Sequence, residues 1–270
     1  MQEAEKIWMN GALVDWPDAQ VHVLSHGLHY GTTVFEGIRS YDADKGTAVF
    51  RLDDHLARLE RSAAMYHMPL PYTREELRGA VHQVIAANDL GGCYIRPIAL
   101  RGYGTMGLFP LDAPVDVAVA AWRWGAYLGE DGLRTGIRAK ISSWRRIGST
   151  TIPATAKAGG QYLNSILAKI ESPTAGHQHA PLPNEAACVA AGPGATARLR
   201  RARLPRVLAL SPGSTPASAP HRAALAARTA PAPPPPHPPP PSPSPPLPPP
   251  PPPPAPRPPP PPRPSPPPAP

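Results

Sequence analysis

One lysine in this sequence stands where covalent chemistry on a carbonyl group is feasible. Lys157 lies in the stretch Ile-Pro-Ala-Thr-Ala-Lys-Ala-Gly-Gly-Gln-Tyr-Leu-Asn at 152–164, among small residues and just before an apolar helical pattern. An amine beside backbone and small side chains can lose its proton near neutral pH, and the two glycines would let the backbone approach a bulky planar partner. We interpret Lys157 as a Schiff-base lysine; on this motif alone, a solvated loop lysine is the alternative.

The composition changes after Glu171. All 16 aromatic residues lie at or before Tyr162, and 30 of the last 40 residues are proline. Residues 1–171 contain 18 basic and 18 acidic residues, whereas 172–270 contain nine arginines and one acid. The net charge of +8 therefore belongs to the tail, and it does not indicate that the folded part binds nucleic acid. A tail of this composition cannot build a core.

Cysteine usage and apolar runs bear on the compartment. Cys93 and Cys188 are the two cysteines, and their spacing suggests neither a disulfide framework nor a zinc site. The first residues are charged and lead straight into a strand pattern, with no signal-peptide core and no apolar run of about 18 residues. We expect a cytoplasmic protein with no membrane contact.

Turn residues and alternating apolar positions predict a strand-rich first part. Residues 6–14 form a hairpin around Asn10-Gly11, a pair that favours a type I′ turn, at the edge of a sheet. A second hairpin joins 33–41 to 47–51. Further strands are expected at 93–98 and 115–122.

Two amphipathic helices should cover this sheet. The first has Asp53 or Asp54 near its N-cap and ends before Pro69, and its apolar face is Leu56, Leu59, Ala63 and Tyr66. The second begins with the capping box Thr73-Arg74-Glu75-Glu76, and its apolar face is Leu77, Val81, Val84 and Ile85.

These elements divide the chain into four parts. Residues 1–122 are expected to form a small α+β domain, and 123–136 a connection. Residues 137–196 would begin a larger domain, with a strand at 137–144 and a helix directly after Gly159-Gly160, and would be degraded after 171. Residues 197–270 read as a disordered low-complexity tail rich in Ala, Arg and Pro.

An ordered set of short motifs carries a family resemblance. The motifs are Ser-His-Gly-Leu-His-Tyr-Gly at 25–31, Val-Phe-Glu-Gly-Ile-Arg at 34–39, His-Leu-Ala-Arg-Leu at 55–59, Tyr-Ile-Arg-Pro at 94–97, Trp-Gly-Ala-Tyr at 124–127 and the Lys157 stretch. On these, residues 1–171 resemble the branched-chain amino-acid aminotransferases, which use pyridoxal 5'-phosphate and have fold type IV. The longer Val-Phe-Glu-Gly-Ile-Arg motif favours this group over D-amino-acid aminotransferase on the same α/β fold.

The resemblance implies a cofactor in a cleft between two domains and a role for Lys157. This lysine would hold pyridoxal phosphate and then carry a proton between the substrate α-carbon and the cofactor. The implied reaction exchanges amino groups between branched-chain L-amino acids and 2-oxoglutarate, in a homodimer or higher homo-oligomer to which the loop 101–107 would contribute.

The resemblance also implies roles for other residues. Arg58 matches the arginine at the cofactor phosphate, and Tyr162 the tyrosine at the phenolic oxygen; a surface arginine and simple helix packing are the alternatives. The implied substrate pocket comprises Tyr30, Phe35, Gly37 and Tyr127 as mostly apolar walls, with Tyr94 near the α-carboxylate, Arg96 at the second carboxylate of glutamate, and Arg39. Ion pairs to acids are the alternative for both pocket arginines.

Beyond Glu171 the chain departs from the family pattern. Ala191 stands where the family has the glutamate that hydrogen-bonds the cofactor ring nitrogen, and Glu185 is six residues too early. Gly192-Pro193-Gly194 retains part of the glycine pattern of the family's phosphate-binding turn. We therefore expect that the amine survives while turnover is weak or absent.

The tail itself allows two interpretations. It reads like a GC-rich gene translated in a second frame, so a frameshift near codons 172–196 is one hypothesis. The other is an inactive remnant that interacts with partners through polyproline.

Overall fold

The structure is a computed structural model that describes residues 2–44, 46–125, 138–174, 176–186, 189–191, 198–201 and 204–207. Predictions that fall elsewhere, including the role of Tyr127 and the polyproline of the tail, lie outside the described residues. The four domain boundaries remain predictions, and the described part of the tail is one two-stranded hairpin, β10 (Arg198–Arg201) with β11 (Leu204–Val207).

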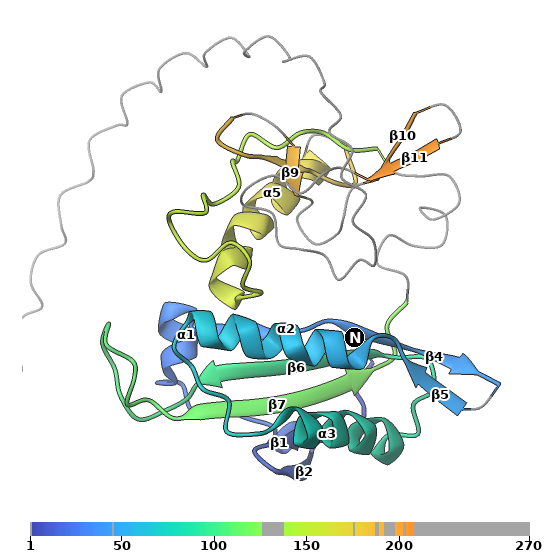
Figure 1. The fold of residues 1–270 in the computed structure, drawn as a ribbon, viewed down its shortest axis with the longest axis vertical. Coiled ribbons are helices and arrows are strands. Elements are labelled where there is room, and N and C mark those ends of the chain that lie inside the picture. Colours follow the sequence, from blue (N-terminus) through green and yellow to red (C-terminus); the bar gives the residue numbers. More distant parts are fainter. Residues whose placement is uncertain are drawn as a thin grey trace, which may run out of the picture. The chain divides into compact units, whose positions relative to one another are not determined.

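A seven-stranded sheet organises residues 2–125 (Figure 1). Its order is β2-β1-β7-β6-β4-β5, with β3 also paired to β6, and all the pairs are antiparallel. The bounds are β1 Lys6–Met9, β2 Ala12–Asp15, β3 Thr33–Phe35, β4 Ile38–Ala43, β5 Gly46–Val49, β6 Tyr94–Arg101 and β7 Val115–Trp122. The predicted hairpin at the sheet edge is confirmed, since Asn10 and Gly11 both have positive φ, as a type I′ turn requires.

The strand expected at 33–41 is interrupted in the structure. β3 and β4 both pair with β6 in one continuous register, with Phe35 opposite Ile98 and Ile38 opposite Ile95. The break falls opposite Pro97, which accepts from the backbone N–H of Glu36 at 2.8 Å but has no N–H to return. This proline therefore frees Glu36 and Gly37 from regular pairing, next to the cavity described below.

Both predicted helices are present and contact each other over the sheet (Figure 1). Helix α2 spans Leu52–Met65 with Arg51 as its N-cap, so the two acids expected near the cap lie in its first turn. Helix α3 spans Arg74–Ala87, and its capping box is formed as expected. The core between helices and sheet is a single cluster that includes Leu56, Leu59, Leu77, Val81, Val84, Ile95, Val117 and Val119, each 0% exposed.

Shorter helical elements precede the core helices. The 3-10 helix η1 spans Trp16–Asp18, and helix α1 spans His26–Tyr30. Helix α1 is tied to the loop after β6, because the ring of His26 contacts Thr32 Oγ1 and the Gly107 carbonyl, each at 2.8 Å. Residues 21–30 and 103–111 thereby form one surface.

The segment 138–191 has less regular structure than expected. Residues 138–144 form no strand, so that prediction was wrong; Ala139 makes a single parallel bridge to His179. The reason is chemical: Lys140 and Ser142 donate backbone N–H groups to the carbonyls of His179 and Pro181, but Pro181 cannot donate back. The strands here are β8 (Leu182–Pro183) and β9 (Val189–Ala191).

The helix predicted after the glycine pair is confirmed. The 3-10 turn η2 (Gly159–Gln161) leads into α5 (Tyr162–Thr174). Its apolar side chains are largely exposed: Leu163 67%, Ile166 51%, Leu167 41% and Ile170 63%. The pattern thus predicts the helix correctly, but not what covers it. Among the described residues, no helix is long and apolar enough to cross a membrane.

Candidate active site

The backbone of Lys157 is fastened to the sheet and to α2. Its N–H donates to Ser62 Oγ at 2.9 Å, and its carbonyl accepts from the N–H of Phe35 at 3.1 Å. Ala158 continues this contact as an antiparallel bridge to Val34. Ala156 and Ala158 are buried in the main core, which explains the small residues around the lysine. The backbone of Lys157 is thus held by the core and does not lie in a free loop.

The glycine pair makes close contacts within the chain. A Cβ on Gly159 would collide with Thr33 Oγ1, and one on Gly160 would lie 3.3 Å from the carbonyl oxygen of Gly31. The two glycines thus let η2 approach residues 31–33, and the expected approach to a planar partner stays a prediction. This close approach sets where α5 begins and where Tyr162 points.

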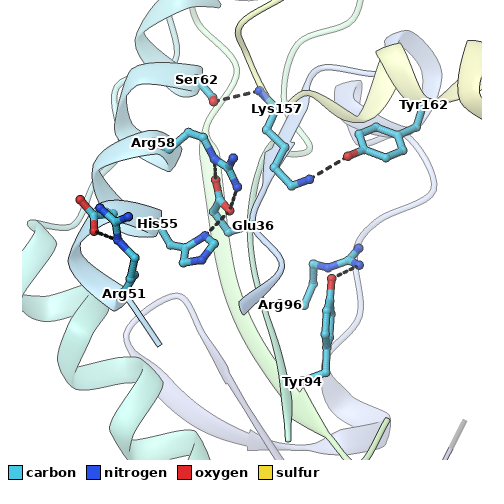
Figure 2. Close-up of polar contacts among 10 residues, drawn as sticks. Glu36, Arg51, His55, Arg58, Ser62, Tyr94, Arg96, Lys157 and Tyr162 are labelled. Atoms are coloured by element: carbon cyan, nitrogen blue, oxygen red, sulfur yellow. Dashed lines mark hydrogen bonds and ion pairs between the residues drawn. The ribbon is translucent and has the colours of Figure 1, made fainter. Parts of the chain in front are cut away.

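The Lys157 amine lies in a cavity of about 440 Å³. Its Nζ donates to the Tyr162 hydroxyl at 2.7 Å and lies 4.8 Å from the centre of the Phe35 ring. Figure 2 shows the side chain extending toward Tyr162. The cavity is lined by Phe35, Gly37, Arg39, Tyr94, Arg96, Trp124, Lys157, Tyr162, Ser165, Ile166 and Lys169.

The β6 side of this cavity combines cations with aromatic rings. Arg96 donates to the Tyr94 hydroxyl at 2.7 Å and lies over the Phe35 ring at 4.6 Å, while its buried Nε has no partner. Arg39 donates to the carbonyls of Trp124 and Gly125 at 2.8 and 2.7 Å. No ion pair joins either arginine to an acid within the described residues. A Cβ on Gly37 would collide with the Tyr94 hydroxyl, so a larger residue there would displace the Tyr94 side chain.

The lining is strongly electropositive. It contains four cations, and none of the described lining residues is a carboxylate. Such a cavity suits an anionic ligand, since the arginines and lysines have only donors to offer.

Arg58 does not line the cavity. It forms a two-point ion pair with Glu36, Nε to Oε1 and Nη2 to Oε2, each at 2.6 Å, and His55 Nδ1 contacts the same carboxylate at 2.9 Å (Figure 2). Burial alone would raise the pKa of Glu36, but the hydrogen bonds from Arg58 and His55 outweigh it and leave this pKa lowered. The surface-arginine alternative for Arg58 is wrong, since its side chain is 14% exposed.

The structure therefore brings together seven of the ten expected site residues, which are Phe35, Gly37, Arg39, Tyr94, Arg96, Lys157 and Tyr162. Arg58 is bound to Glu36, Tyr30 lies on the surface at 43% exposure, and Tyr127 lies outside the described residues. Sequence reasoning missed Trp124, Ser165, Ile166 and Lys169 as lining residues. Helical spacing from Tyr162 could have indicated the three on α5.

Residues 33–203 match the family model described as amino-transferase class IV. The chain belongs to the class IV aminotransferase family. It is 49% identical over 178 residues to the branched-chain-amino-acid aminotransferase of Escherichia coli K12, covering 66% of this chain and 58% of that protein. To the enzyme of that name from Pseudomonas aeruginosa it is 44% identical, covering 70% and 61%. The chain thus spans about three-fifths of the length of these relatives.

Solved structures place the fold in the same family. The crystal structure of the Escherichia coli branched-chain enzyme matches with a TM-score of 0.76 and 42% identity, covering 79% of this chain and 71% of that one. The branched-chain enzyme from Thermobaculum terrenum, solved in its pyridoxal-phosphate form, matches with a TM-score of 0.71 and 30% identity, covering 80% and 70%. The expected mixed α/β fold of type IV is confirmed.

Proposed function

We propose that this chain carries the lysine side of a pyridoxal 5'-phosphate site for transfer of amino groups between branched-chain L-amino acids and 2-oxoglutarate. The observation that carries the proposal is the Lys157 amine, held by backbone contacts to β3 and α2 and directed into a cationic cavity. The relatives named as branched-chain-amino-acid aminotransferases support the substrate class.

The residues present fit one side of the cofactor. The amine of Lys157 and the hydroxyl of Tyr162 lie 2.7 Å apart in the cavity. The amine would serve the aldehyde of the cofactor, and the hydroxyl would serve the phenolic oxygen next to that aldehyde. The cationic lining of the cavity suits the anionic groups of a ligand. The described lining offers no carboxylate for the ring nitrogen, in keeping with Ala191 where the family pattern has glutamate.

Pyridoxal phosphate, when bound, supplies an aldehyde that combines with amines and a ring that accepts electrons from the substrate α-carbon. Lys157 would hold the aldehyde through Nζ; once the substrate amine has taken its place, the freed Lys157 amine would take the proton of the α-carbon and return it. Because Lys157 Nζ donates to Tyr162, the tyrosine oxygen accepts there and its own hydrogen is directed elsewhere.

The β6 side of the cavity suits the substrate. Arg96 with the Tyr94 hydroxyl can hold a carboxylate, and Phe35 with Trp124 gives aromatic walls for an aliphatic chain. One cavity can in this way accept leucine and glutamate in turn. The missing carboxylate at the ring nitrogen would weaken the electron sink, so we expect slow turnover.

The test is a half-reaction measured on the full chain. With pyridoxal phosphate and leucine, we expect slow release of the branched 2-oxo acid, lost in Lys157→Ala and kept in the surface control Lys140→Gln. Arg96→Gln should impair glutamate more than leucine, because glutamate alone has a second carboxylate. Equal release by the native chain and Lys157→Ala would contradict the proposal, as would a native chain to which no cofactor attaches.

The proposal includes a homodimer or higher homo-oligomer. Exposed apolar side chains crowd the surface formed by 21–30 and 103–111: Val21, Val23, Leu24, Leu28, Tyr30, Tyr103, Met106, Leu108, Phe109 and Leu111, with Leu108 at 88% exposure. Apolar patches of this kind mark protein contacts. Tyr30 belongs to this surface, so its expected substrate role would have to act across such a contact.

Two further expectations remain proposals: a cytoplasmic location, and an inactive protein that interacts with partners through its polyproline tail. The second has no support from the described residues, since residues 208–270 lie outside them.

A further inference from the structure

One wall of the cavity gathers donors that the proposed reaction does not use. Ser165 and Lys169 both line the cavity from α5. They are four residues apart, so they lie on one face of the helix, one turn from each other. This wall belongs to a different element from the Arg39 and Arg96 wall on β4 and β6.

Arg146 lies behind this wall as a buried cation. It is 8% exposed, its Nη1 and Nη2 donate to Ser165 Oγ at 3.3 Å and Gln161 Oε1 at 3.2 Å, and its Nε has no partner in the part of the chain that the structure describes. Burial lowers the pKa of its guanidinium, and none of the described residues pairs a carboxylate with it. Buried arginines are normally compensated by a negative charge.

The donor inventory fixes what Ser165 can offer to the cavity. A guanidinium has only N–H donors, so Ser165 Oγ accepts from Arg146. The hydroxyl hydrogen of Ser165 is then available to an acceptor in the cavity that this serine lines. A donor polarised by a neighbouring cation is strengthened toward anions.

Lys169 adds a full charge to the same wall of the cavity. Its Nζ donates to the Gln178 carbonyl at 2.7 Å. An ammonium carries three hydrogens, so two remain for a ligand. Burial, and after it the positive charge of Lys169, lowers the pKa of His179.

We propose that Ser165 and Lys169, backed by Arg146, form an oxyanion subsite on the α5 wall of the cavity. Its ligand is the phosphate or carboxylate group of a small molecule, bound separately from the carboxylate expected at Arg96. This inference goes beyond the proposed amino transfer and does not require Lys157 to react. The buried charge of Arg146 favours binding of the anion, because an anion bound at Ser165 would lie next to this guanidinium and offset its charge.

The test is calorimetric titration of the full chain at low salt, without added cofactor, using inorganic phosphate and acetate in separate runs. We expect saturable binding, weakened about tenfold in Lys169→Gln, as the loss of one charge-assisted hydrogen bond implies. Lys169→Arg should retain most of the affinity, since the charge remains. Tighter binding of phosphate than of acetate would identify the ligand group as phosphate, and the reverse order as a carboxylate.

Two comparisons separate this site from the lysine chemistry and from general charge. Lys169→Gln should cost the same factor in a Lys157→Ala background, where no cofactor can be attached. Lys6→Gln removes an exposed lysine elsewhere and should change nothing. Absence of saturable binding of both anions, or an equal loss in Lys6→Gln, would overturn the proposal.

Discussion

Glu36 in residues 2–125 and Arg146 in the segment 138–191 are two buried charges with opposite surroundings. The carboxylate of Glu36 is 0% exposed and is paired with Arg58 and His55. Arg146 is almost as buried but contacts neutral oxygens, and its Nε has no partner among the described residues. Glu36 is therefore compensated by cations of its own region, whereas the described residues supply no anion to Arg146.

Apolar side chains repeat the contrast. Leu56 and Leu59 of α2 are 0% exposed, while Leu163 and Ile170 of α5 are 67% and 63% exposed. The same amphipathic pattern thus gives a covered face in one helix and an open face in the other. Matching substitutions in the two helices should therefore have very different costs.

The largest effect is expected from Glu36→Ala. It leaves the charge of Arg58 buried without its two-point partner, which should lower the free energy of unfolding by about 3–5 kcal/mol. Chemical denaturation of the full chain measures this. The control Glu60→Ala breaks an exposed pair with Arg74 and should change little. Equal costs for both variants would remove the distinction between buried and surface pairs.

A pair of leucine truncations sharpens the comparison between helices. Leu56→Ala should cost about 2–5 kcal/mol because it opens a cavity in the core. Leu163→Ala should cost no more than about 0.5 kcal/mol, since that side chain is already mostly in water. Both are measured by denaturant midpoints with unchanged slope. A large cost at Leu163 would mean that the α5 face is covered in solution.

Arg146→Met should act in the opposite direction to Glu36→Ala. Removing a buried, uncompensated charge while keeping the packing volume should leave stability unchanged or raise it by about 1 kcal/mol. The same change should weaken phosphate binding at Ser165 and Lys169. A loss of stability as large as that of Glu36→Ala would show that Arg146 has a strong partner.

The smallest effect is a dependence on acid. The folded-state pKa of Glu36 is below its usual value of 4.5, so its ionised form favours the folded chain. That contribution is complete above the unfolded pKa and is lost as the pH falls through the lowered folded pKa. The free energy of unfolding, measured from neutral to acidic pH, should therefore fall less steeply in Glu36→Gln than in the native chain. Parallel profiles would contradict the assigned role of Glu36.

Local chemistry made much of the fold predictable. The Asn10-Gly11 turn, the Thr73 capping box and the apolar spacing of α2 and α3 each specify their own element, and all are found. The strand expected at 137–144 failed because pairing depends on a distant neighbour, and that neighbour contains Pro181.

The candidate site was predictable only where a motif carries it. Seven residues that meet in the cavity were expected from the family motifs, but the place of Lys169 follows from helical spacing only once Tyr162 is placed, and the partnership of Glu36 with Arg58 comes from no single local pattern. They depend on how α5 and α2 pack against the sheet. Their positions relative to Lys157 therefore had to come from the structure.

The central claim is that Lys157 is the amine that binds the cofactor aldehyde, and one measurement addresses it directly. The full chain is incubated with pyridoxal phosphate, reduced with borohydride and digested, and the modified lysine is located by mass spectrometry. We expect one pyridoxyl group on Lys157, with Lys169 and Lys140 unmodified. Modification spread over several lysines, or undiminished labelling in Lys157→Ala, would contradict the account.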